Sequence, residues 1–148
     1  MIQKFKIPDQ AFTELKEKLK KITEPTNDKL AGNIDKEYLA NDCIPIIAPS
    51  ILSQIVEHNI FKKYIVENSY MFSKETMNIY IHDLWVNFQA KHEFNPIHNH
   101  SGLLSFIVFV SIPYFAKQQK EISPGKNSNC DRAGMLEFVL PNGLSNTS

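Results

Sequence analysis

The chain has 148 residues, 43% of them hydrophobic, which is enough to bury the core of a single domain over residues 1–148. Its 16 basic and 16 acidic residues cancel, so broad electrostatic binding to nucleic acid or to anionic lipid is not expected. No apolar run approaches the roughly 18 residues of a membrane span, and the N-terminus lacks the apolar segment of a secretory signal, which predicts a cytoplasmic protein.

The first 70 residues are predicted to form a helical support. Apolar residues recur at helical spacing over residues 11–22, with lysines on the opposite face. Residues 46–66 carry a broad apolar stripe with the same period, which predicts a second amphipathic helix. Residues 23–42, between the two helices, are polar and rich in turn-forming residues, so we expect a loop there.

Residues 76–140 are predicted to be rich in β-structure, because the hydrophobic period changes from about 3.6 to about 2 after residue 68. The expected strands cover residues 78–82, 84–88, 103–112 and 135–140, with a long polar loop over residues 117–132. Two helices packed on an antiparallel sheet make an α+β architecture, or a β-sandwich decorated by helices.

Two histidines one residue apart, His98 and His100, carry the strongest chemical signal. On a strand, residues i and i+2 point to the same face and lie about 6.6 Å apart. Both imidazoles can then converge on one metal ion, with metal–nitrogen bonds of about 2.0–2.1 Å. A structural interpretation stays open, in which the two side chains hydrogen-bond within a polar turn before a buried strand.

The order of short motifs around this pair resembles a known enzyme family. W-V-N at residues 85–87 precedes H-N-H at residues 98–100, and L-L-S follows at residues 103–105. This order is similar to that of 2-oxoglutarate- and Fe(II)-dependent oxygenases, in particular the subgroup of marine phages and bacteria. The resemblance covers residues 78–140 and includes a later strand with the sequence G-M-L-E-F at residues 134–138.

The resemblance implies a double-stranded β-helix, or jelly roll, with Fe(II) and 2-oxoglutarate as cofactors. It implies His98 and His100 as metal ligands, together with a distal histidine and a following Arg or Lys for the 2-oxoglutarate carboxylate. No histidine follows His100, and no Arg or Lys lies in or after the last predicted strand. We therefore expect a truncated or divergent copy of the fold, or one whose incomplete sheet is completed by a partner chain or a second copy.

Further candidate residues lie near the motif. Tyr80 and Asn87 are expected to line a co-substrate pocket, although alternate residues of a strand can equally face solvent. The remaining histidines are assigned structural or surface roles, and two carboxylates match no motif; these residues are His58, His82, His92, Asp83 and Glu93.

Two functions from different classes remain. The first is an oxygenase of the hydroxylase type acting on a small-molecule or protein substrate. The alternative is a non-catalytic jelly-roll module for interaction or phage assembly, in the host cytoplasm or the virion, with a vestigial metal site. A cupin-type metal protein is a third interpretation, but it needs a Glu about four residues after the histidines, where this chain has none.

Overall fold

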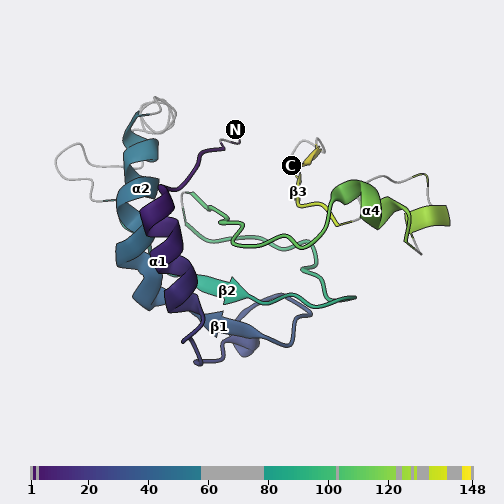
Figure 1. Ribbon diagram of the computed structural model, residues 1–148, viewed down its shortest axis with the longest axis horizontal. Coiled ribbons are helices and arrows are strands. Elements are labelled where there is room, and N and C mark those ends of the chain that lie inside the picture. Colours follow the sequence, from purple (N-terminus) through teal and green to yellow (C-terminus); the bar gives the residue numbers. More distant parts are fainter. Residues whose placement is uncertain are drawn as a thin grey trace. The chain divides into compact units, whose positions relative to one another are not determined.

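The computed structural model describes residues 2, 4–57, 79–102, 104–122, 125–127, 129, 134–139 and 145–147 (Figure 1). These residues belong to two compact units, Met1–Ser105 and Phe106–Ser148. The boundary expected between residues 70 and 76 lies outside the described residues. The prediction of a single domain therefore stays a prediction.

Two helices of the first unit pack against each other (Figure 1). Helix α1, Asp9–Leu19, follows Pro8 and buries Leu15 and Leu19. Helix α2, Ile44–Glu57, buries Ile47 and Ile51. Both predicted helices are confirmed. Each is 11 residues or longer, which is long enough for the helical period to appear in the sequence. The part of the second predicted helix after residue 57 lies outside the described residues.

The first unit also contains a short antiparallel sheet of two strands. Strand β1, Glu37–Leu39, pairs with strand β2, Trp85–Asn87, with Glu37 opposite Asn87 and Leu39 opposite Trp85. Residues 24–26 bond to the other edge of β1, through Thr26 N–H to Glu37 O and Leu39 N–H to Glu24 O, both 2.9 Å. Strand β1 is therefore central, with backbone partners on both sides.

The loop predicted over residues 23–42 is wrong at β1. That segment also holds two 3₁₀ turns, η1 at Asn27–Lys29 and η2 at Asn41–Cys43. A strand of three residues is too short for an alternating pattern to stand out from a polar background. Tertiary pairing with β2, some 48 residues later in the chain, determines this strand.

The buried hydrophobic side chains of the described residues all lie between residues 7 and 51. They are Ile7, Leu15, Leu19, Ile34, Ala40, Cys43, Ile47 and Ile51. The described part of the chain after residue 79 contributes half-buried side chains instead, such as Trp85 and Val86. The core therefore lies with α1, α2 and β1.

The second unit is small. It contains helix α4, Ala116–Lys120, a 3₁₀ turn η4 at Gly125–Asn127, and an antiparallel pair of strands, β3 at Glu137–Val139 and β4 at Ser145–Thr147. Strand β3 confirms the strand predicted over residues 135–140. The loop predicted over residues 117–132 is wrong at α4, where Gln118 Oε1 accepts a hydrogen bond from Phe115 N–H at 2.8 Å and fixes the first turn.

The strand predicted over residues 103–112 is not formed in the described residues 104–112. A strand requires a partner for its backbone groups, and high β-propensity alone does not supply one. The described residues nevertheless confirm the α+β class, with helices and two small antiparallel sheets. None of the helices in the described part of the chain is long and apolar enough to cross a membrane.

Candidate metal centre

The segment that carries the two histidines is connected by backbone hydrogen bonds to the residues before β1. After β2 the chain turns back at residues 88–94, with His92 in the left-handed region at φ 75°. Asn33 and Phe94 then form a bridge, in which Asn33 N–H donates to Phe94 O at 2.9 Å. Residues from Phe94 onward therefore start beside residues 32–35.

Glu93 stabilises this turn with its carboxylate. One oxygen accepts a hydrogen bond from Ala90 N–H at 2.6 Å, and the other accepts one from Asp35 N–H at 2.9 Å. These two backbone donors hold the pKa of Glu93 below its usual value. Both oxygens thus have a structural role: the Glu93 latch, meaning these two hydrogen bonds, connects the turn to the segment before β1.

The two histidines meet tip to tip. Their Nε2 atoms are 2.9 Å apart, and the ring centroids are 4.6 Å apart at an angle of 60°. Two ligands at right angles on one ion, with bonds of about 2.0–2.1 Å, would have their nitrogens about 2.9 Å apart. The 2.9 Å contact is a hydrogen bond between the two rings, as the structural interpretation expects, and the same distance would suit two adjacent ligands of one metal ion.

The tautomer of His98 is set by the backbone. Its Nδ1 lies 2.7 Å from the carbonyl oxygen of Pro96, which can only accept, so Nδ1 carries the proton. The lone pair of a neutral His98 is then on Nε2, the atom that faces His100. A backbone carbonyl on the far nitrogen is the usual support for a metal-binding histidine.

His100 is held in place by an aromatic neighbour. The indole of Trp85 stacks on its imidazole, with centroids 5.8 Å apart and planes within 10°. His100 is exposed, and the partial desolvation of its ring, followed by the charge of His98, lowers its pKa. A lower pKa leaves the imidazole neutral over a wider pH range, and a metal binds only the neutral form.

The remaining predicted residues fall into different places. Tyr80 is 72% exposed, and its ring lies against His82 rather than against the histidine pair. Asn87 is half-buried in β2, and its Oδ1 is a buried acceptor without a hydrogen-bond partner. His92 is exposed in the turn, and His58 lies outside the described residues.

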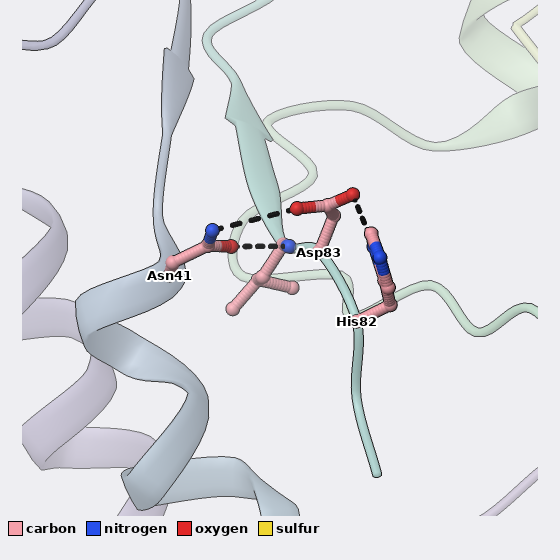
Figure 2. A network of polar contacts seen from close by, with 4 residues as sticks. Asn41, His82 and Asp83 are labelled. Carbon is pink, nitrogen blue, oxygen red and sulfur yellow. Dashed lines mark hydrogen bonds and ion pairs between the residues drawn. The ribbon is translucent and has the colours of Figure 1, made fainter.

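His82 and Asp83 belong to a separate polar network (Figure 2). His82 Nδ1 is 2.6 Å from Asp83 Oδ2, and this contact is the main cause that lowers the pKa of Asp83. Asn41 reaches the same carboxylate at 3.5 Å, and its Oδ1 accepts from Leu84 N–H at 2.8 Å (Figure 2). This network connects η2 to the start of β2, which is a structural task.

The residue that the sequence did not indicate is Glu37. It is 0% exposed, and neither of its carboxylate oxygens has a hydrogen-bond partner. Burial raises its pKa first, the nearby charge of Glu93 raises it further, and His98 acts in the opposite sense. Glu37 belongs to no motif, and the polar segment around it predicts a loop. Its strand forms by tertiary pairing, in which Glu37 lies opposite Asn87.

Gly32 leaves the space that the Glu37 carboxylate occupies. A Cβ atom at position 32 would collide with Glu37 Oε1, and it would come within 2.7 Å of Asn95 Oδ1. The oxygens of Glu37 and Asn95 therefore lie together over Gly32. Asn95 precedes His98 by three residues, so this space lies next to the histidine segment.

The imidazoles of the pair have donor atoms that suit a metal ion. Neutral imidazoles are suitable ligands for Fe(II). Glu37 and the Oδ1 of Asn87 are acceptors, so they do not fit 2-oxoglutarate, whose carboxylates need donors or cations. Across the described residues, no three His, Cys, Asp or Glu side chains come together as a metal-binding group, so the histidines stand as a pair.

Comparisons of the chain with protein-family models, with curated proteins and with solved structures found no match.

Proposed function

We propose that the chain binds a single Fe(II) ion through His98 and His100 and is an oxygenase of the Fe(II)-dependent hydroxylase type. The observation that carries the metal site is the 2.9 Å separation of the two Nε2 atoms. The reaction class rests on the resemblance of residues 78–140 to the oxygenase family, and a jelly roll is the fold that the same resemblance implies.

Each residue of the site has a defined task. His98 binds through Nε2, while the Pro96 carbonyl holds its Nδ1–H. His100 would bind through its own Nε2 after that atom loses the proton it donates to His98 Nε2, and the indole of Trp85 stacks on its ring. Bound Fe(II) would supply redox chemistry and open coordination positions, which these side chains do not. The substrate is an unidentified small molecule or protein.

2-Oxoglutarate is the co-substrate that the resemblance implies, and a titration decides its part in the proposal. We would titrate Fe(II) without oxygen by calorimetry, with and without 2-oxoglutarate. We expect one ion per chain for the wild type and no saturable binding for His98→Ala. Tighter binding in the presence of 2-oxoglutarate would support the co-substrate that the resemblance implies. A matched control is His92→Asn, because it removes an exposed imidazole and keeps a residue that tolerates positive φ.

The result also separates the enzyme from the alternative, a non-catalytic interaction module with a vestigial site. The observation that favours the module is that His98 and His100 have no third ligand among the described residues. Equal heats of Fe(II) binding for the wild type and His98→Ala would refute the metal site and favour the non-catalytic module. Fe(II) binding that depends on His98 but is unchanged by 2-oxoglutarate would support the metal site and refute 2-oxoglutarate as the co-substrate.

A further inference from the structure

We propose that a proton on Glu37 keeps residues 93–95 closed over β1, and that loss of this proton releases the segment that carries the histidines. The Glu37 carboxyl would then act as a pH-sensitive switch. The hydrogen bonds between residues 33–35 and 93–94 are the part that opens. The proposal concerns the chain without metal, so it goes beyond the proposed function and does not require it.

The first observation is that Glu37 is buried without any group that donates a hydrogen bond to it. Its side chain is 0% exposed, and neither carboxylate oxygen has a hydrogen-bond partner. An ionised carboxylate is strongly unfavourable in such a place, whereas a protonated carboxyl is neutral and carries an O–H donor. The carboxylate of Glu93, in contrast, accepts from two backbone N–H groups, which favour its ionised form. The closed structure therefore favours a proton on Glu37.

The second observation is that the neighbour of Glu37 on β2 is an acceptor in need of a donor. Asn87 lies directly opposite Glu37, and its buried Oδ1 has no hydrogen-bond partner. In the adjacent pair, Phe88 N–H donates to Lys36 O, so Glu37 and Asn87 form a non-hydrogen-bonded pair. The side chains of such a pair lie close together on one face of the sheet. Only a protonated Glu37 has a hydrogen to donate to this amide oxygen.

The third observation is that Asn95 covers the carboxyl. A Cβ atom placed on Gly32 would lie 2.9 Å from Glu37 Cδ and 2.7 Å from Asn95 Oδ1, so the two side chains meet over this glycine. Asn95 is exposed whereas Glu37 is not, which places the amide on the solvent side of the carboxyl. Its Oδ1 is a second acceptor for the Glu37 proton. Movement of residues 93–95 would bring water to Glu37.

Ionisation of Glu37 would act against the bonds that hold this segment closed. The bridge between Asn33 and Phe94 and the Glu93 latch connect the segment to the residues before β1. Among charged groups, Glu93 opposes the ionisation of Glu37, and His98 favours it. The facing side chains of β2 and of residue 95 are neutral amides. An ionised Glu37 would repel the Glu93 carboxylate and gain water on opening, so rising pH favours the open form.

Hydrogen exchange in the metal-free chain measures this opening. We would follow the amides of Asn33 and Asp35, which donate to Phe94 O and to Glu93 Oε1. Their exchange rates, from about pH 4.5 to 7.5 with a chelator, are divided by those of unprotected amides. Protection of both should fall by up to about tenfold per pH unit, because the closed form holds one proton more than the open form. It should stay at least about tenfold below that of the α1 amides, since the helices remain packed.

Glu37→Gln keeps the shape of the side chain and removes its titration, so the fall in protection should disappear. Glu24→Gln, an exposed change beside β1, is the matched control and should keep the wild-type fall. A fall that persists in Glu37→Gln would overturn the proposal, because it would then come from the histidines, which titrate in the same range. Protection equal to that of the α1 amides would overturn it as well, because the whole chain would then be opening.

Should Glu37→Gln not fold, the wild type alone decides. An NMR titration of the chain with ¹³C-labelled glutamate gives the pH at which the Glu37 carboxyl loses its proton. Above this pH the closed and open forms hold the same number of protons, so the fall in protection should level off there. A carboxyl that titrates at its ordinary 4.5 or below would overturn the proposal.

Discussion

Trp85 and His100 form a stacked pair whose effect on the histidine is open to direct measurement. Partial desolvation lowers the pKa of the exposed His100, and the indole of Trp85 lies nearly parallel to its ring at a centroid distance of 5.8 Å. We expect Trp85→Leu to raise this pKa toward its usual value, because more water reaches the imidazole. An NMR pH titration of the ring protons in the wild type and in Trp85→Leu would test this. An unchanged titration of His100 would show that the stacking does not desolvate the ring.

The buried carboxylate of Glu37 makes the stability of the metal-free chain depend on pH. Its pKa in the folded chain is raised above the ordinary 4.5, so the folded state holds the proton to higher pH than the unfolded state does. The contribution of Glu37 is thus fully present below about pH 4.5 and is lost as the pH rises through the folded pKa. Glu37→Gln cannot lose a proton there.

We therefore expect the melting temperature of Glu37→Gln to exceed that of the wild type by a margin that grows between pH 4.5 and pH 7.5. Thermal unfolding of both proteins at several pH values, in the presence of a chelator, would measure this margin. A margin that stays constant or shrinks with rising pH would mean that the wild-type carboxylate is ionised without penalty in the folded chain.

At the scale of elements, Gly32 and β1 form one packing unit. Gly32→Ala would place a Cβ against Glu37 Oε1 and Asn95 Oδ1, so one of the side chains must move. We expect a loss of about 1–3 kcal/mol in the free energy of unfolding, as for other overpacked sites. Urea unfolding measures it. The loss should be smaller in a Glu37→Ala background, where the colliding carboxylate is gone; an equal loss would place the strain elsewhere.

The turn between β2 and the histidines depends on the Glu93 latch. Glu93→Ala would leave the N–H groups of Asp35 and Ala90 without their carboxylate acceptor. We expect faster hydrogen exchange at these two amides, while the amides of α1 keep their protection. Exchange followed by NMR would show this difference. Unchanged exchange at Asp35 would mean that the bridge between Asn33 and Phe94 holds the turn without Glu93.

The sequence predicted those elements whose pattern is long enough to be read. Helices α1 and α2 are each about three turns or longer, and each buries two apolar residues four positions apart, as their apolar stripes predict. The His98–His100 pair was found because a two-residue period is a local property. Strand β1 and Glu37 were missed because a three-residue strand has no period, and the burial of Glu37 depends on chain segments 11 to 13 residues before it and about 50 residues after it.

At the scale of the whole molecule, the second unit exposes large apolar side chains on an extended segment. These side chains are Ile107, Phe109, Ile112 and Phe115, each more than half exposed. Solvent-exposed apolar residues on a segment of high β-propensity favour association between chains. We expect self-association that increases with concentration in sedimentation velocity and decreases in a Phe109→Lys variant. A monomer at all concentrations would show that this segment does not pair between copies.

The histidine pair lies outside the hydrophobic core, whose buried members in the described residues end at Ile51. The segment of His98 and His100 is attached by hydrogen bonds, among them the bridge between Asn33 and Phe94. Those bonds can open locally while α1 and α2 stay packed, because none of these buried side chains belongs to the histidine segment. The lifetime of a bound ion would then be set by the opening rate of this one segment. A chelator would remove the metal from a chain that remains folded.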